Sequence, residues 1–290
     1  MTTTGFDAAG YKRDQRENWD AISEGWAGCR EEFETGGAPV SALLLELGGV
    51  RPGHRVLDVG TGTGDPALAA ASAVGPRGRV TGIDLAPEMI ERARARVRPG
   101  DNVGFEVGDA ESLDRPAASF DVVLSRWGLM FVVDRVATLR SLARMLAPGG
   151  VLAAATWAAP GSLAPMTSLG FGVLAARLEL PPPQPGAPSP FSMGDPDVLG
   201  EELAEAGFGQ IEVSSFEAPF VLSSPERYAE YSKAVTPPGL KALLRERFGS
   251  EDDPDTWAEV AAAAAAFRRG DGRVSLPSKT LLARAVSPAA

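Results

Sequence analysis

The stretch that decides the fold is residues 56–66, which read Val56-Leu57-Asp58-Val59-Gly60-Thr61-Gly62-Thr63-Gly64-Asp65-Pro66. An apolar run of strand type leads directly into three glycines at alternate positions. Glycine permits positive φ and lets a ligand approach the backbone closely. We expect Asp65 to cap a helix whose first residue is Pro66, since this pair is typical of a helix start. A strand, a tight turn and a helix N-terminus in this order are typical of a nucleotide-type binding site.

The charges around this turn indicate what kind of ligand it suits. Residues 62–67 formally satisfy the dinucleotide pattern G-x-G-x-x-G/A. Asp65 and Pro66 disfavour a pyrophosphate, because they place a carboxylate and a residue without an N–H where free donors are needed. Asp58, directly before the turn, adds further negative charge. We therefore expect a ligand with a cationic end, and a purely structural turn is the alternative.

Two further aspartates follow the next β-like runs of the chain. Asp84 ends the run 79–83, where a carboxylate can accept hydrogen bonds from both hydroxyls of a ribose. Asp109 follows the run 103–107, and an acceptor there can take a hydrogen of an adenine amino group. The alternative for Asp84 is an N-cap of the helix that opens at Pro87, and for Asp109 a solvated turn.

Short β-like runs alternate with helical segments along most of the chain. This alternation predicts βαβ units, so the expected fold class is α/β with a doubly wound, mainly parallel sheet of seven strands. One helix is expected from Arg135 to Leu146, ended by residues 148–150 before a strand from Val151 to Thr156. The expected division is an N-terminal helical lid (1–50), a cofactor-binding core (51–160), a cap insertion (161–194), the continued core (195–222), a helical cap (223–271), and the last core strand and tail (272–290).

Composition excludes several classes of function. The 290 residues carry a net charge of −10 without a basic cluster, which disfavours a polynucleotide substrate and an anionic membrane surface. Cys29 is the single cysteine and His54 the single histidine, so neither an internal disulfide nor a zinc site is expected. The sequence shows no leader-type or membrane-spanning apolar run, and we expect a cytoplasmic protein.

The order of elements, the glycine turn, Asp84 and residues 108–110 resemble the class I S-adenosylmethionine-dependent methyltransferases. More narrowly, the chain is similar to the small-molecule branch that includes the ubiquinone and menaquinone biosynthesis methyltransferases and many natural-product methyltransferases. The resemblance covers residues 15–157 well and the rest in outline. It implies a Rossmann-like fold with a helical cap, S-adenosyl-L-methionine as cofactor and a small-molecule acceptor, in a monomer or a homodimer.

The resemblance also implies which residues hold the cofactor. Trp26 stands where many relatives have a tyrosine that reaches the cofactor carboxylate, and Ser125 lies in the segment 120–126, which resembles the fourth-strand motif. The others are grouped by the part of the cofactor they contact: Gly60, Thr61 and Gly62 for the methionine part, Asp84 for the ribose, Leu85 and Met89 for the faces of the adenine, and Asp109 and Ala110 for its edge.

The sequence assigns no catalytic residue. Many relatives carry a histidine shortly after the fourth strand, whereas residues 125–131 of this chain contain none. Methyl transfer from a sulfonium has an activated leaving group, so positioning and desolvation can suffice. Tyr11, Arg126 and Asp134 are candidates to reach the acceptor, and His54 is not, because it lies at the amino end of the first strand.

Acceptor specificity is expected to come from the segments outside the sheet, whose apolar, mainly aromatic side chains would line a pocket, although each one alone is more typical of core packing. The predicted function is O-, N- or C-methylation of a small organic molecule, in secondary metabolism or quinone biosynthesis. Two alternatives stay open: a methyltransferase-like protein that binds the cofactor without methyl transfer, as a scaffold or cyclase, and a nicotinamide-dependent oxidoreductase. The candidate lining residues are Trp19, Trp26, Phe171, Phe191, Met193, Tyr228, Tyr231 and Trp257, with Trp127, Phe131 and Trp157 at strand ends.

Overall fold

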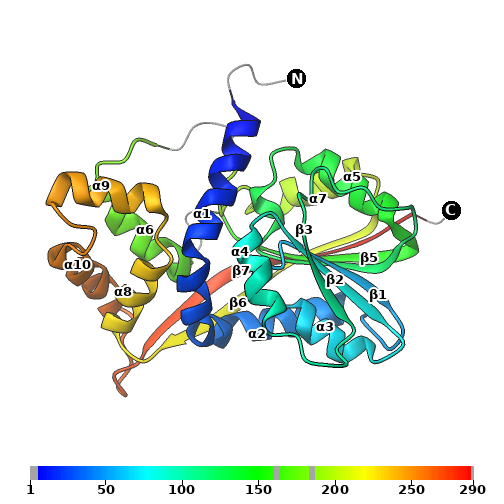
Figure 1. Cartoon of the computed structure of the whole chain (residues 1–290), viewed down its shortest axis with the longest axis horizontal. Helices are drawn as coiled ribbons and strands as arrows, with labels where there is room; N and C mark the ends of the chain where they lie inside the picture. Colours follow the sequence, from blue (N-terminus) through cyan, green and yellow to red (C-terminus); the bar gives the residue numbers. More distant parts are fainter. Residues whose placement is uncertain (1–5, 160–163, 183–186, 289–290) are drawn as a thin grey trace. The chain divides into compact units, whose positions relative to one another are not determined.

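Strand β1 (Arg55–Val59) lies between two parallel neighbours in a seven-stranded sheet. The computed structural model, shown in Figure 1, describes residues 6–159, 164–182 and 187–288. The strand order is β3-β2-β1-β4-β5-β7-β6, in which β1 to β5 pair in parallel and β7 runs antiparallel to β5. The α/β class and the mainly parallel sheet are therefore confirmed. The other strands are β2 (Arg79–Asp84), β3 (Val103–Val107), β4 (Phe120–Arg126), β5 (Leu146–Trp157), β6 (Gly209–Leu222) and β7 (Val274–Val286).

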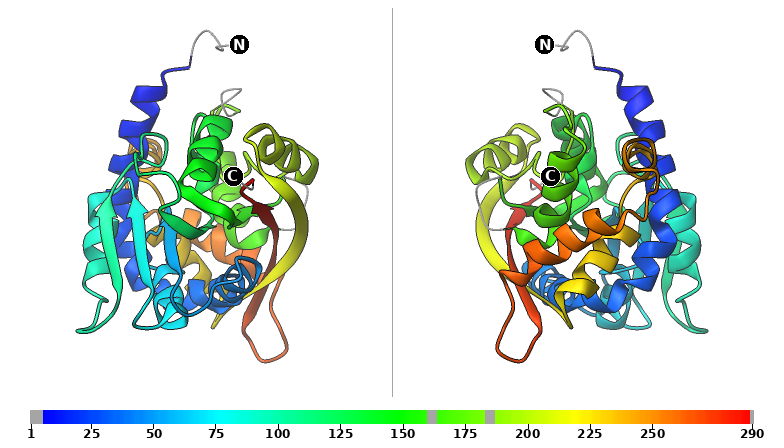
Figure 2. Two further views of the ribbon diagram at one scale, coloured as in Figure 1. Left: turned by 90° about the vertical axis from the view of Figure 1, so that its right-hand side faces the viewer. Right: turned by 90° about the vertical axis from the view of Figure 1, so that its left-hand side faces the viewer.

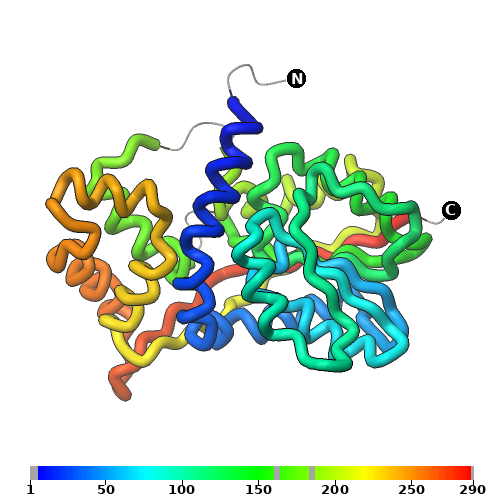
Figure 3. Tube along the Cα trace, viewed as in Figure 1, coloured from blue at the N-terminus to red at the C-terminus, as the bar shows by residue number. Residues whose placement is uncertain are grey.

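The chain divides into two compact units. The sheet unit comprises the described residues within 38–162, 188–216 and 279–290, and the helical unit those within 1–37, 163–187 and 217–278. The long strands β6 and β7, yellow and red in Figures 2 and 3, contribute residues to both units. Residues 161–163 and 183–186 of the expected cap insertion lie outside the described residues.

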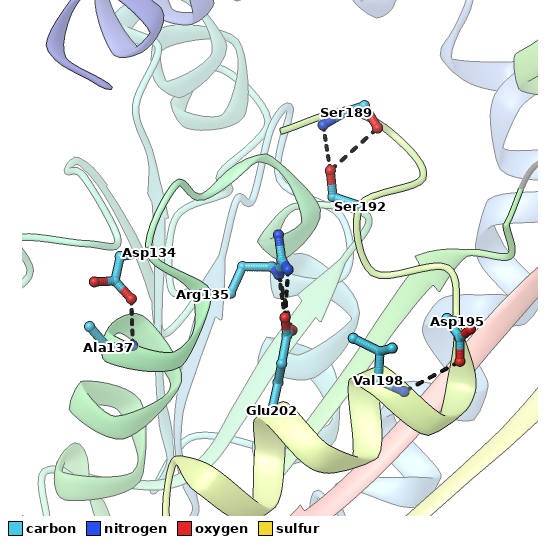
Figure 4. A network of polar contacts seen from close by, with 8 residues as sticks. All are labelled: Asp134, Arg135, Ala137, Ser189, Ser192, Asp195, Val198 and Glu202. Atoms are coloured by element: carbon cyan, nitrogen blue, oxygen red, sulfur yellow. Dashed lines mark hydrogen bonds and ion pairs between the residues drawn. The ribbon is translucent and has the colours of Figure 1, made fainter. Parts of the chain in front are cut away.

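In the sheet unit, consecutive buried residues in the central strands allow helices to pack on the sheet. Helix α3 (Ala67–Val74) packs on β1 and β2, and α4 (Pro87–Arg94) packs on β2 and β3. Helix α5 (Arg135–Met145) packs on β5 and on α7 (Pro196–Glu205). The Arg135 guanidinium joins α5 to α7 by donating to the Glu202 carboxylate at 2.8 Å (Figure 4).

In the helical unit, α1 (Ala8–Gly28) packs on α8 (Pro225–Ala234) and α9 (Pro238–Phe248). Helix α10 (Pro254–Ala265) packs on α8 and on α6 (Pro165–Arg177). Helix α2 (Arg30–Leu47) begins in this unit and ends in the sheet unit. Gly25 lets α1 approach α8, because a Cβ there would lie 2.2 Å from the carbonyl oxygen of Ala234. Within the described residues, no helix combines the length and the apolar character that a membrane span requires.

The start of β5 differs from the sequence-based expectation. Helix α5 ends at Met145, and β5 begins at Leu146 rather than at Val151, so residues 148–150 lie inside the strand. Leu146 pairs with Phe120 and Val151 pairs with Val122, which makes an irregular register where Gly149 has φ +75°. The Pro-Gly-Gly sequence thus bulges the strand instead of only stopping the helix.

Candidate functional site

The turn after β1 is anchored on the neighbouring strand β2. The backbone N–H groups of Gly60 and Thr61 both donate to the carbonyl oxygen of Ile83 at 2.9 Å. Gly60 has φ +70°, and a Cβ there would lie 2.9 Å from the Cα of Gly128 in the loop after β4. Glycine is therefore required at position 60 by the backbone conformation and by this close approach of two loops.

Asp58 is buried beneath the glycine turn, where its carboxyl group forms hydrogen bonds within the protein. Its Oδ2 atom accepts hydrogen bonds from Thr61 Oγ1 at 2.6 Å and from the N–H of Ala67 at 3.2 Å. Complete burial raises the pKa of Asp58 from 3.8 to about 7. The expectation that Asp58 supplies charge for a cationic ligand is therefore wrong, because its carboxyl group is fully buried and serves the turn and the first residue of α3.

The raised pKa of Asp58 predicts a particular pH dependence of stability. A carboxyl group whose folded pKa is above its unfolded value stabilises the protein at low pH, and this contribution is lost as the pH rises to about 7. Between pH 5 and pH 8 the free energy of unfolding should fall by roughly 2–3 kcal/mol through this group alone. Urea unfolding of the wild type and of Asp58→Asn across this pH range measures the fall, because the asparagine side chain does not titrate. Parallel pH profiles of the two proteins would contradict the assignment.

Asp65 has a different partner from the one expected. Helix α3 begins at Ala67, with Pro66 at the N-cap position and no side-chain cap. The Asp65 carboxylate instead accepts from the Arg96 guanidinium at 2.6 Å, and the same guanidinium donates to the carbonyl oxygen of Thr63. The predicted N-cap role is wrong because Asp65 pairs with Arg96, while Asp58 takes the N–H of Ala67.

Asp84 lies against the glycine turn from the end of β2. Its Oδ2 atom accepts from the N–H of Gly62 at 2.8 Å, and its Oδ1 atom accepts from the N–H of Ala86 at 3.0 Å. Helix α4 has Ala86 at its N-cap position without a side-chain cap, so the alternative of Asp84 as the N-cap does not hold. Gly62 has φ +53°, and a Cβ there would meet no atom within 4 Å. A half-buried carboxylate therefore stands beside an open, side-chain-free stretch of backbone.

The loop after β3 joins this arrangement through the backbone. The N–H of Gly108 donates to the carbonyl oxygen of Asp84 at 2.8 Å. Asp109 follows, and its Oδ1 atom accepts from the N–H of Glu111 at 2.9 Å. Because β1, β2 and β3 are neighbouring parallel strands, Gly62, Asp84 and Asp109 lie at the same carboxyl edge of the sheet.

Sequence comparison assigns a domain family to the region that contains these strand ends. Residues 56–150 match the family model described as a methyltransferase domain. This stretch begins in β1, ends in β5 and contains all the strand ends described above. Residues 56–150 form a class I methyltransferase domain. The cofactor of this domain family is S-adenosylmethionine.

Two curated relatives are similar to part of this chain. The ubiquinone/menaquinone biosynthesis C-methyltransferase UbiE of Ectopseudomonas mendocina is 43% identical over 123 residues, which is 41% of this chain and 48% of that protein. The aklanonic acid methyltransferase DauC of Streptomyces sp. (strain C5) is 38% identical over 145 residues, which is 49% of this chain and 64% of that protein. The chain thus spans less than two thirds of the length of either relative.

A solved structure agrees on the fold. The crystal structure of the [4+2]-cyclase SpnF superimposes with a TM-score of 0.52 at 22% identity, and the match covers 87% of this chain and 82% of that one. At this level of identity the likeness shows the fold alone. It extends well beyond the methyltransferase domain at residues 56–150.

The remaining expected cofactor residues differ in their surroundings. Leu85 and Ala110 are half-buried beside Asp84 and Asp109, whereas Met89 is buried in α4. Ser125 is fully buried at the end of β4, where its hydroxyl donates to the carbonyl oxygen of Val59 at 2.8 Å and accepts from the N–H of Leu129 at 3.3 Å. Ser125 thus holds the loops after β1 and β4 in place.

Trp26 belongs to the helical unit and not to the methyltransferase domain. Its ring lies edge-on to Phe33 with centroids 4.7 Å apart and edge-on to Tyr231 at 6.0 Å. Its indole Nε1 atom is buried and has no hydrogen-bond partner among the described residues. The contact of Trp26 with a cofactor stays a prediction.

The candidates for acid–base work have structural partners. Arg126 donates to Ser41 Oγ at 2.8 Å, and Asp134 accepts from the N–H of Ala137 at the start of α5. Tyr11 belongs to the helical unit, with its ring 5.6 Å from that of Phe6. His54 precedes β1 and accepts from Arg51 Nε at 2.7 Å, which agrees with its exclusion from catalysis.

Most of the candidate side chains for an acceptor pocket are buried in the core. Trp127 and Trp157 stack with centroids 4.4 Å apart, and Trp127 Nε1 donates to Thr280 Oγ1 at 2.9 Å. Phe171 is the exception, with 53% of its surface exposed. Trp19, Phe131 and Phe191 are half-buried. Those that are buried are Trp127, Trp157, Met193, Tyr228, Tyr231 and Trp257.

Sequence reasoning missed two residues that shape the site. Arg96 binds the turn across 31 positions of sequence, and Glu111 reaches the loop after β4 across 22. Neither belongs to a local motif, and a charged residue after a helix or a strand is usually solvated. Only the three-dimensional pairing reveals their function.

Proposed function

We propose that this chain binds S-adenosylmethionine at the carboxyl edge of β1 to β4 and transfers its methyl group to a small organic acceptor. The observation that carries the proposal is the pairing of the Asp84 carboxylate with the N–H of Gly62, beside open backbone. It lies inside the stretch that matches the methyltransferase domain.

The residues present fit such a cofactor. A ribose diol needs hydrogen-bond acceptors, and a carboxylate supplies only acceptors. The absence of a Cβ at Gly62 leaves room for a ligand against the backbone. A pyrophosphate fits less well, since the Asp84 carboxylate already occupies the N–H of Gly62 and Pro66 has none to offer. The acids at this edge therefore favour an adenosyl sulfonium over a dinucleotide.

The proposed cofactor residues follow the strand order. The turn after β1 would hold the methionine part, the end of β2 the ribose, and the loop after β3 the edge of the adenine. Ser125 would act by holding the loops after β1 and β4 together, because its hydroxyl forms hydrogen bonds with the backbone at Val59 and at Leu129. The full set is Trp26, Gly60, Thr61, Gly62, Asp84, Leu85, Met89, Asp109, Ala110 and Ser125.

Methyl transfer from a sulfonium requires little of the protein beyond positioning the cofactor and the acceptor. When bound, the cofactor supplies a methyl group on a sulfonium, whose bond to sulfur breaks as the bond to the acceptor atom forms, leaving S-adenosylhomocysteine. The proton of the acceptor passes to solvent or to a base, and we assign no residue of this chain to that step. Residues of the site would orient the two reactants and exclude water.

The proposed acceptor is a small molecule of quinone or natural-product type. UbiE is named for ubiquinone and menaquinone biosynthesis and DauC for aklanonic acid, and both names support this class. The net charge of −10 supports a small molecule over a polynucleotide. We leave the methylated atom open among oxygen, nitrogen and carbon.

A second candidate function is cofactor binding without methyl transfer. The fold is shared with a protein named as a [4+2]-cyclase, so the fold alone does not decide the reaction. The absence of a histidine in residues 125–131 is consistent with this alternative. The nicotinamide oxidoreductase alternative has no support from the family match.

Methyl transfer can be tested directly with cofactor labelled on its methyl group. The purified chain is incubated with this cofactor, held at a low concentration, and a panel of hydroxylated quinones and aromatic acids, with Asp84→Ala as the control whose cofactor binding is weakened. We expect label in an organic product and S-adenosylhomocysteine in equal amount. Conversion of a panel member without S-adenosylhomocysteine formation would favour the second function instead.

A further inference from the structure

Glu111 connects the loop after β3 to the segment that precedes α5. Its Oε1 atom accepts from the N–H of Val133 at 2.9 Å, and its Oε2 atom accepts from the N–H of Asp134 at 3.2 Å. Each carboxylate oxygen thus takes one of two successive backbone N–H groups. Only an ionised carboxylate offers two acceptor atoms in this arrangement.

Both ends of this connection are held by further hydrogen bonds. On one side, the N–H of Glu111 donates to Asp109 Oδ1, which fixes the turn through Ala110. On the other side, Asp134 caps α5 by accepting from the N–H of Ala137 at 3.0 Å (Figure 4). The Glu111 carboxylate therefore ties the Asp109 turn to the start of a helix that packs on the sheet.

We propose that Glu111 is a positioning residue that sets the Asp109–Ala110 turn for the adenine end of the cofactor. This inference rests on the proposed function, because it takes that turn to contact the adenine. Glu111 acts through the backbone of the turn and does not touch the reacting atoms. Loss of its carboxylate frees the turn and weakens binding of the adenosine part, while the chemical step on bound cofactor stays intact.

Glu111→Gln is the informative variant. The amide keeps one acceptor oxygen but turns an NH₂ group toward the second backbone N–H, so one of the two hydrogen bonds is lost. Glu106→Gln makes the same chemical change on neighbouring strand β3, where the side chain is half exposed and pairs with Arg115. Glu111→Asp keeps the charge but is too short to reach both N–H groups, and it serves if Glu111→Gln does not fold.

Calorimetry with S-adenosylhomocysteine and with methylthioadenosine, which lacks the amino acid part, tests the proposal. We expect Glu111→Gln to weaken both ligands by the same factor, about 5- to 30-fold. The KM for the cofactor should rise by a similar factor while kcat at saturation stays within about twofold. Glu106→Gln should bind both ligands as the wild type does.

Three results would overturn the proposal. The first is wild-type affinity of Glu111→Gln for both ligands. The second is weaker binding of S-adenosylhomocysteine with methylthioadenosine unchanged, which would place the effect away from the adenosine part. The third is an equal loss of affinity for both ligands in Glu106→Gln, which would show that the effect of Glu111→Gln is not specific to position 111. Failure of the wild type itself to bind S-adenosylhomocysteine would instead reject the proposed function.

Discussion

Asp84→Ala is expected to weaken binding of S-adenosylhomocysteine by ~1.5–3 kcal/mol, the usual value of hydrogen bonds to a charged group. The Asp84 carboxylate lies at the end of β2 and accepts from the N–H of Gly62 in the turn after β1. Alanine removes the proposed acceptor of the ribose hydroxyls and releases the turn at the same time. The two losses act in the same direction, so this is one of the two largest effects that we expect.

Calorimetric titration of three proteins separates the ribose contact from a general change of the fold. Asp84→Asn keeps the size of the side chain and should also lose affinity, because it replaces one acceptor by a donor. Asp101→Ala is the control, since Asp101 also accepts a backbone N–H, from Arg98 at 2.7 Å, but lies exposed before β3. Wild-type affinity in Asp84→Ala would remove the ribose assignment.

Alanine substitutions at Gly60 and Gly62 should separate stability from binding. Both glycines have positive φ, which costs a side chain about 1–2 kcal/mol. At Gly60 the new Cβ would also lie 2.9 Å from the Cα of Gly128, which adds about 1–3 kcal/mol of overpacking. At Gly62 the Cβ meets no protein atom within 4 Å and extends into the space proposed for the ligand.

Urea unfolding and calorimetry on the same samples measure the two effects. Gly60→Ala should lose roughly 2–5 kcal/mol of unfolding free energy. Gly62→Ala should lose only the about 1–2 kcal/mol of unfolding free energy that positive φ costs a side chain. It should nevertheless bind S-adenosylhomocysteine at least ~10-fold more weakly, because the added methyl group clashes with the ligand. Equal stability of the two variants would contradict the close approach of the two loops. Wild-type binding by Gly62→Ala would place the ligand elsewhere.

The elements of the fold could be predicted because their signals are local. The apolar runs and the glycine, proline and aspartate positions between them predicted the seven strands closely, apart from the start of β5. The Asp84 and Asp109 positions followed from the same reasoning, since ends of neighbouring parallel strands meet at one edge. The family match at residues 56–150 agrees with the resemblance drawn from these motifs.

The roles of Asp58 and Asp65 could not be predicted, because the first depends on burial and the second on a partner far away in sequence. Asp65 was expected to cap α3, but its carboxylate pairs with Arg96 instead. Asp58 was expected to carry charge, but its complete burial raises its pKa to about 7, although the hydrogen bond from Thr61 acts in the opposite direction. Burial and long-range pairing decide the state of a carboxyl group, and a local motif contains neither.

The central claim is tested most directly by calorimetric titration of the wild-type chain with S-adenosylhomocysteine, with NADH titrated in parallel. We predict saturable one-to-one binding of S-adenosylhomocysteine and no heat of binding with NADH. Binding of NADH without binding of S-adenosylhomocysteine would contradict the account, because it would mean that the carboxyl edge of β1 to β4 selects a pyrophosphate rather than an adenosyl sulfonium.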